Sequence, residues 1–118
     1  MGFMDVRPLN TGHVLVIPKA HAAYLADLPP STGERLFERA MAVAAALRRS
    51  GLPCEGVNLH LADGEAAGQE VYHVHLHVFP RYRGDGFGLR VGPNYGRLAD
   101  RTELNEVAAK LRAAIPRH

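Results

Sequence analysis

Hydrophobic and polar positions along this chain fall into two kinds of pattern, and the first is typical of β-strands. Apolar residues fill positions 14–17 without a break, and they alternate with polar ones at 71–79. Residues 3–6 and 56–61 are further short segments of this kind. Gly12, Pro18 and Pro80 border these segments, and both residue types interrupt regular structure. The pattern predicts strands over 3–6, 14–17, 56–61 and 71–79.

The second pattern has helical spacing. Ser31 can cap a first helix, with Glu34 as its capping-box partner, and Gly51 marks the end of that helix. A second helix is expected over 101–115. The apolar positions expected on the two buried faces are Leu36, Phe37, Ala40, Val43, Ala44 and Leu47 in the first helix and Leu104, Val107, Ala108 and Leu111 in the second. These elements predict an α+β domain on an antiparallel sheet, with one long helix and a C-terminal helix.

Composition indicates the number of domains, the cellular compartment and the kinds of partner to expect. A chain of 118 residues, 47% of them hydrophobic and 22% charged, is typical of a single globular domain over 1–118. No apolar run reaches the roughly 18 residues of a membrane span, so no membrane partner is expected. The only cysteine, Cys54, cannot form an internal disulfide, which predicts a cytoplasmic protein. A net charge of +2 is too weak to indicate a nucleic-acid partner.

Three histidines in the segment 71–79 carry the candidate chemistry. Because side chains alternate along a strand, His73, His75 and His77 should lie on one face, with neighbours roughly 6.5–7 Å apart. The apolar residues between them, and Val78 after them, should point into the core. One face of the sheet therefore carries a row of imidazoles.

Four interpretations of this row are open. The histidines could simply face solvent. They could hold a catalytic metal, although Glu70 has the opposite parity and supplies no third ligand. They could bind a nucleotide without turning it over. Finally, one neutral imidazole could attack phosphorus while its neighbour holds the leaving group, which suits a side chain that titrates near neutral pH. The spacing favours this last interpretation.

The motif His73-Val74-His75-Leu76-His77 resembles the signature of the histidine triad family. Residues 3–8, 12–19 and 68–73 also match the family, so the resemblance covers Phe3 to Gly88, the expected core, and leaves 98–116 as a C-terminal helical segment. It implies a homodimer with about five antiparallel strands in a full domain, and fewer here. It further implies a purine nucleotide or nucleotide conjugate as partner, no cofactor, and cleavage of phosphoramidate, phosphoanhydride or phosphoester bonds through a nucleotidyl-histidine intermediate.

The resemblance also implies roles for individual residues. His75 resembles the nucleophile, His77 the residue that contacts the phosphate and assists the leaving group, His73 a supporting histidine, and His13 the fourth histidine of their hydrogen-bond network. Asp5 is similar to the carboxylate that binds the ribose hydroxyls. The other expected substrate contacts are Phe3 and Val6 at the base, Gly68 and Gln69 in the loop facing the phosphate, and Glu70 through its backbone N–H.

Several positions depart from the family pattern. Ala62 and Glu70 stand where an asparagine and a serine or threonine are common, which keeps a nucleotide-binding scaffold with little turnover as the alternative function. Family members usually carry a further segment before Phe3, so we expect this chain to bind nucleotide more weakly than an extended form. Bacterial members hold zinc through a cysteine pair in that segment and residues at His21 and His73. This chain has no cysteine pair, so no metal is predicted.

Overall fold

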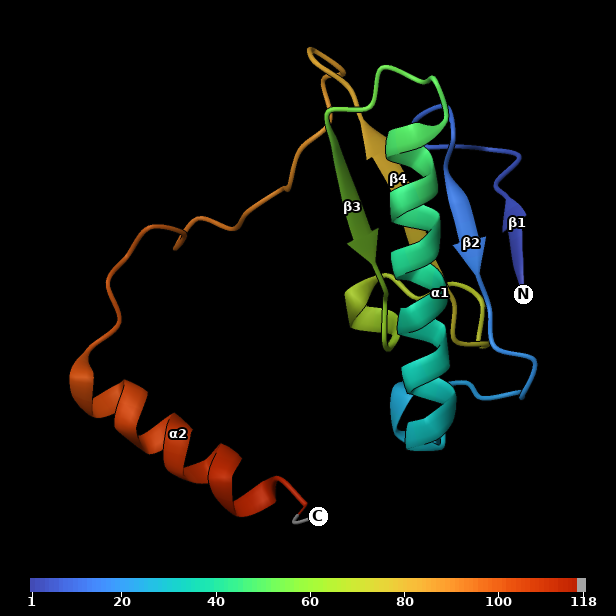
Figure 1. Cartoon of the computed structure of the whole chain (residues 1–118). Coiled ribbons are helices and arrows are strands. Elements are labelled where there is room, and N and C mark those ends of the chain that lie inside the picture. Colours follow the sequence, from blue (N-terminus) through green and yellow to red (C-terminus); the bar gives the residue numbers. More distant parts are fainter. Residues whose placement is uncertain (117–118) are drawn as a thin grey trace. The chain divides into compact units, whose positions relative to one another are not determined.

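The structure is a computed structural model that describes residues 1–116 in two compact units, the first ending at Gly86 and the second beginning at Phe87. The first unit contains a four-stranded antiparallel sheet, which confirms the predicted α+β class (Figure 1). The strands are β1 (Gly2–Met4), β2 (Val14–Val16), β3 (Gly56–His60) and β4 (Leu76–Arg81), in the order β1-β2-β4-β3. The histidine-bearing strand β4 is thus an inner strand.

A single long helix, α1 (Pro30–Arg49), lies along one face of this sheet (Figure 1). The predicted cap at Ser31 was wrong, because the helix begins at Pro30 and no side chain caps its first turn. The fixed φ of proline suits the first helical position, so the helix starts one residue early and includes Ser31. Two short 3-10 turns, η1 (Leu25–Asp27) and η2 (Glu65–Ala67), complete the unit.

The core lies between α1 and the sheet face that α1 covers. Val74, Leu76 and Val78 are buried there, as the alternation predicted, together with Leu36 and Ala40 of α1. Phe37 is the exception on the helix, with 56% of its surface exposed. One residue turns a helix by about 100°, so Phe37 lies beside the buried stripe and not within it.

Strand β4 begins later than the sequence pattern predicted, at residue 76 and not at 71. Strand β2 pairs only with 76–78 and β3 only with 77–81, so residues 71–75 have no ladder partner. Pro80 lies inside the strand and does not end it. A proline is tolerated in a strand where one side is open, and here only β3 pairs with β4 at that position.

The end of the first unit is fixed by one carboxylate, that of Asp85. It accepts hydrogen bonds from Asn10 Nδ2 at 2.9 Å, from Arg81 Nε at 2.9 Å and from the backbone N–H of Tyr82 at 3.0 Å. The Asp85 side chain is only 9% exposed, so these charge-assisted bonds are shielded from water. This carboxylate ties the chain after β4 to the turn before β2.

The second unit contains α2 (Arg101–Ala114), which confirms the predicted C-terminal helix. Its apolar residues Leu104, Val107 and Leu111 are exposed rather than buried within the unit. Residues 87–100 form neither helix nor strand and are exposed throughout. Within the described residues, no helix has the length and apolar character needed to cross a bilayer. That residues 1–118 act as one domain stays a prediction.

Candidate active site

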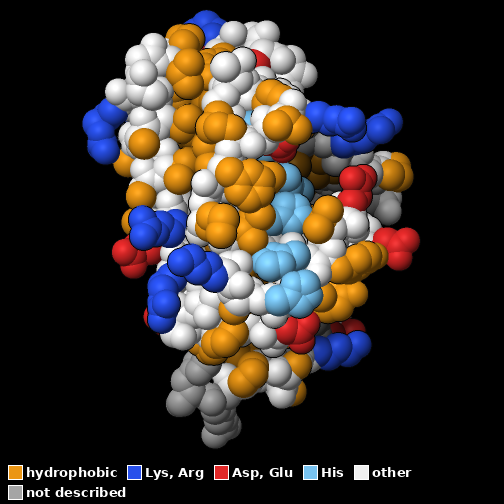
Figure 2. All heavy atoms as spheres, turned by 90° about the vertical axis from the view of Figure 1, so that its right-hand side faces the viewer, with side chains coloured by type: hydrophobic (Ala, Val, Ile, Leu, Met, Phe, Trp, Pro, Cys, Tyr) orange, Lys and Arg blue, Asp and Glu red, His pale blue; other side chains and the backbone are white. Residues whose placement is uncertain are grey.

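The uncovered face of the sheet carries a row of four side chains, one from each strand. Phe3 on β1 pairs with Leu15 on β2, Leu15 pairs with His77 on β4, and His77 pairs with His60 on β3. The row is therefore apolar on β1 and β2 and histidine-bearing on β4 and β3. Figure 2 shows histidines gathered in a column on this face, with apolar side chains beside them.

A pocket of about 310 Å³ opens on this face and brings the histidines together with the apolar strands. It is lined by Phe3, Asp5, Leu15, Ile17, Val71, His73, His75 and His77. A larger hollow of about 480 Å³ lies between Met1 and α1, but no histidine lines it. The chemistry therefore points to the smaller pocket, which combines an apolar half with a row of imidazoles.

The proton on His75 is placed by the main chain. Its Nδ1 lies 2.8 Å from the carbonyl oxygen of His73, and a carbonyl can only accept, so His75 Nδ1–H is the donor. The neutral ring then carries its lone pair on Nε2. A lone pair on a nitrogen without a proton is what a nucleophile requires.

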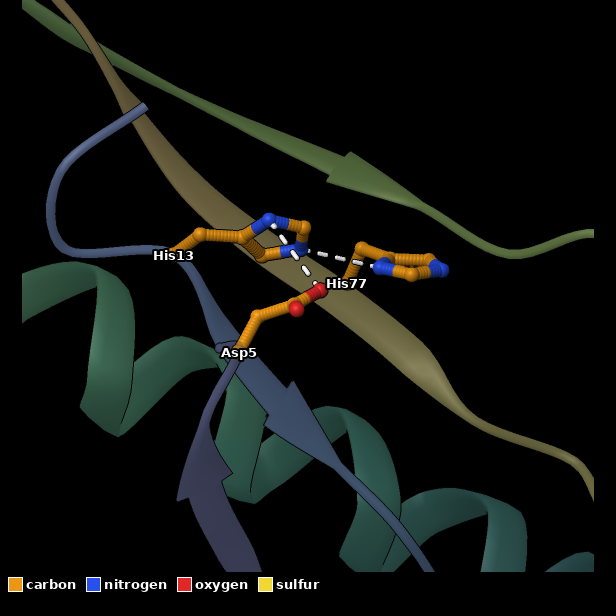
Figure 3. A group of neighbouring side chains, drawn as sticks. All are labelled: Asp5, His13 and His77. Carbon is orange, nitrogen blue, oxygen red and sulfur yellow. Dashed lines mark hydrogen bonds and ion pairs between the residues drawn. The ribbon is translucent and has the colours of Figure 1, made fainter. Parts of the chain in front are cut away.

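The proton on His77 is placed by two hydrogen bonds in series, and Figure 3 shows the second of them, between His13 and His77. The backbone N–H of Leu9 donates to His13 Nδ1 at 3.1 Å, so a neutral His13 has its proton on Nε2. His13 Nε2–H in turn donates to His77 Nδ1 at 2.9 Å. A neutral His77 therefore carries its proton on Nε2, where it can donate to a ligand.

Burial keeps these two rings neutral. Burial first, and then the nearby histidines His75, His13 and His60, together lower the pKa of His77 to about 4, while Asp5 acts in the opposite direction. Burial also lowers the pKa of His13, against a partial offset from Asp5. At neutral pH in the unliganded protein, His77 is thus a neutral hydrogen-bond donor. A bound phosphate would raise its pKa, because an opposite charge favours the protonated ring.

Asp5 supplies the carboxylate that the sequence pattern did not place near the histidines. Its Oδ2 lies 3.5 Å from His13 Nδ1, while Oδ1 accepts the backbone N–H of Arg7 at 2.8 Å. Asp5, His13 and His77 each offer a ligand atom within 4.8 Å of the others, so these three residues could hold a metal ion. However, the facing nitrogens of the two rings already form a hydrogen bond with each other. The absence of a resident metal therefore stays a prediction.

His73 has a supporting position. Its Nε2–H donates to the carbonyl oxygen of Pro18 at 3.1 Å, and its Nδ1 lies 3.1 Å from His21 Nδ1. In a neutral His73 ring, the nitrogen bound to the carbonyl carries the proton and the other nitrogen accepts, so His21 is then the donor of this pair. These bonds hold His73 in place, and its carbonyl in turn orients His75.

The loop before the triad is built differently from the sequence expectation. The side chain of Gln69 is buried, with its amide donating to the carbonyls of Ala23 and Val71 and accepting from Gly64 N–H. Gly68 has a φ of +95°, and a Cβ there would meet no protein atom, so its backbone conformation alone explains the glycine. Gly68, Gln69 and Glu70 do not line the pocket. Their contact with phosphate stays a prediction.

Apart from that loop, the pocket lacks one residue that was expected there and contains others that were not expected. Phe3 lines the pocket as expected, whereas Val6 is 93% exposed and lies outside it. Leu15, Ile17 and Val71 in the pocket wall, and His60 beside His77, were not predicted from the sequence. The signal that could have drawn attention to position 60 is a further histidine in a segment expected to be a strand, two residues after Asn58.

Comparison with curated proteins finds relatives of similar sequence. An uncharacterized HIT-like protein of Borreliella burgdorferi is 41% identical over 93 residues, which are 78% of this chain and 67% of the relative. The adenylylsulfatase HINT3 of Arabidopsis thaliana is 34% identical over 98% of this chain and 56% of its own length. The adenosine 5′-monophosphoramidase HNT1 of Saccharomyces cerevisiae is 38% identical over 76% of this chain and 53% of its own length.

The fold is also that of known structures. A crystal structure of a HIT family protein from Bacillus subtilis superposes with a TM-score of 0.85 at 30% identity, covering 99% of this chain and 82% of that one. The HIT domain profile matches residues 1–84, which is most of the chain. The triad motif, the fold and this match together show that the chain belongs to the histidine triad (HIT) family.

Proposed function

We propose that this protein is a nucleotidyl hydrolase or transferase that cleaves a phosphoramidate, phosphoanhydride or phosphoester bond of a purine nucleoside phosphate. One observation carries the proposal. A free lone pair on His75 Nε2 and an N–H on His77 Nε2 belong to two rings that line the same pocket, with centroids 4.9 Å apart. A nucleophile beside a hydrogen-bond donor is the pairing that phosphoryl transfer needs.

In the first step, the lone pair of His75 Nε2 attacks phosphorus and forms a P–N bond. The bond to the leaving group breaks, and its electron pair goes with the leaving atom. An amine already protonated on nitrogen departs neutral, while phosphate or sulfate departs as an anion. His77 Nε2–H donates to a phosphate oxygen, and the His73 carbonyl stabilises the positive charge on the nucleotidyl-imidazole of His75.

In the second step, water attacks phosphorus and the P–N bond breaks, returning its electron pair to His75 Nε2. The oxygen of water stays on phosphorus with one proton, and the other proton passes to solvent. A nucleophile other than water in this step would make the protein a transferase. His75 returns to its starting tautomer because its Nδ1–H has remained bonded to the carbonyl throughout.

The apolar half of the pocket supports a nucleoside as the group carried on phosphorus. Phe3, Leu15 and Ile17 can cover one face of a base, and Asp5 at the same pocket can accept from ribose hydroxyls. The names of two relatives, an adenylylsulfatase and an adenosine 5′-monophosphoramidase, support an adenine nucleotide.

The test is the variant His75→Ala. Without its nucleophile the protein should fold and bind nucleotide but lose turnover by orders of magnitude. Mass spectrometry of the wild type quenched during turnover should find a nucleotidyl adduct on the peptide containing residue 75, and the variant should lack it. A variant rate above about a tenth of wild type, worth only about 1.4 kcal/mol, would show that His75 is not the nucleophile.

A nucleotide-binding scaffold with little turnover is the second candidate. It is favoured by Glu70 and by Ala62, which is buried and has no polar group to offer a phosphate. A turnover panel of adenosine phosphoramidate, phosphosulfate and dinucleoside polyphosphates separates the two functions. The same panel run in chelator tests for a metal at Asp5, His13 and His77, and unchanged rates would exclude one.

We also propose that the protein works as a cytoplasmic homodimer. The sheet ends in the strands β1 and β3, and Phe37 and Met41 on α1 are exposed. Pairing of two identical subunits about a twofold axis would cover such surfaces. Light scattering at micromolar concentration should give the mass of two chains, and the mass of one chain would contradict the proposal.

A further inference from the structure

A further histidine, His60, stands beside the triad, and no hydrogen bond holds its ring within the part of the chain that the structure describes. It is the last residue of β3 and lies directly opposite His77, with ring centroids 5.8 Å apart. The residue is exposed, and no group within residues 1–116 forms a hydrogen bond with its ring. Its polar nitrogens are therefore available to a ligand that reaches past His77.

The direction in which His60 lies follows from the strand order. Phe3 and Leu15 are on one side of His77, and His60 is on the other side. Neighbouring strands are about 4.8 Å apart, so a nucleotide with its base over β1 and its phosphate at β4 has its remaining substituent within reach of β3. His60 is thus on the side of the phosphate away from the apolar half of the pocket.

We infer that His60 is a specificity-determining residue that binds the oxygens of an anionic leaving group, such as the sulfate of a nucleoside phosphosulfate or the second phosphate of a nucleoside diphosphate. The inference rests on the proposed function and deepens it. An imidazole N–H donates well to such oxygens, whereas an amine leaving group offers no oxygen to accept. His60 forms no covalent bond and moves no proton in the reaction.

A competing explanation is that His60 acts only through His77. The charge of His60 lowers the pKa of His77, and this effect would reach every substrate that uses His77. Direct contact with the leaving group would instead affect only those substrates whose leaving group carries anionic oxygens. The two explanations therefore differ in their dependence on substrate.

The experiment compares adenosine 5′-phosphosulfate with adenosine 5′-phosphoramidate as substrates of wild type and His60→Ala. We expect kcat/KM for the phosphosulfate to fall by about 10-fold or more, the worth of one charge-assisted hydrogen bond, with most of the change in KM. The phosphoramidate should change less than about twofold, a difference worth under about 0.5 kcal/mol. Leu59→Ala is the matched control, since that side chain points to the other face of β3.

Equal losses on both substrates would overturn the inference and show that His60 acts through His77. Unchanged kinetics on both substrates, or wild-type turnover of the phosphoramidate without turnover of the phosphosulfate, would overturn it as well. Calorimetry separates this failure from failure of the proposed function. If wild type turns over neither substrate but prefers adenosine diphosphate to monophosphate, and His60→Ala loses that preference, His60 keeps its role and the catalytic proposal falls. If neither nucleotide binds, both the inference about His60 and the proposed function are wrong.

Discussion

At the scale of single residues, main-chain atoms decide which ring nitrogens are reactive. The carbonyl of His73 keeps the proton of His75 on Nδ1, and the N–H of Leu9 acts through His13 to keep the proton of His77 on Nε2. A main-chain group is not removed by changing its own side chain. The two tautomers are therefore fixed by the path of the chain, and they persist as long as that path does.

Asp5 gives a prediction at this scale, because it lines the pocket while one of its oxygens accepts from Arg7 N–H and the other lies 3.5 Å from His13 Nδ1. If Asp5 binds ribose, adenosine monophosphate should bind about 10- to 100-fold more tightly than its 2′-deoxy form, the worth of a hydrogen bond to a charged group. Asp5→Asn should reduce this preference. Calorimetry on both nucleotides and both proteins makes the measurement. Equal affinities of the wild type for the two nucleotides would show that Asp5 interacts with His13 and does not bind the ribose.

At the scale of elements, short strands depend on the turns that join them. Strand β1 has three residues, β2 has three, and the turn between them ends at Gly12. Gly12 has a φ of +101°, and a Cβ there would lie 3.1 Å from both Leu52 and Pro80. This turn places both Asp5 and His13, so its glycine matters to the site as well as to the fold.

Gly12→Ala is therefore expected to lower the free energy of unfolding by about 1–3 kcal/mol, through backbone strain and crowding. Gly33→Ala provides the opposite case, because Gly33 lies inside α1 with open space around it and no positive φ. It should stabilise the protein by about 0.4–1 kcal/mol. Urea unfolding of the two variants and wild type gives both values. Similar midpoints for the two variants would show that conformation at Gly12 is unimportant.

Sequence periodicity predicted the helices and strands well, but it did not predict which strands pair with each other. The alternation around His75 correctly separated the triad from Val74, Leu76 and Val78, because strand geometry is local. The same reasoning could not place β3 next to β4, since strand order and register depend on contacts between distant segments. For this reason His60 was missed. The helix start was misplaced because Pro30 and Ser31 were competing signals one residue apart.

At the scale of the whole molecule, the buried imidazoles make stability depend on pH. An unfolded chain binds protons on its histidines near pH 6.5, while folded His77 does so only near pH 4. Between these values the unfolded state binds more protons, so stability is full above about pH 6.5 and decreases as the pH falls toward 4. Burial also lowers the pKa of His13, which likewise reduces stability as the pH falls.

We expect a loss of roughly 2 kcal/mol by pH 4 from His77, allowing for solvent screening of a partly exposed ring. Urea midpoints at pH 7.5, 6, 5 and 4 give the profile of wild type. His77→Gln should flatten it, because the variant has no group to protonate at that position. If both proteins lose stability in parallel over this range, the effect belongs to other groups.

Asp85 has a consequence for how this chain would be cut by a protease. Its carboxylate holds Asn10, Arg81 and the backbone of Tyr82 together, so the backbone next to residue 85 cannot enter a protease active site without breaking these bonds. Residues 87–100 are exposed and lack helix or strand, and unprotected backbone of this kind is where nicking concentrates. Trypsin should cut first at Arg90 or Arg97 and leave a resistant fragment that retains the entire triad.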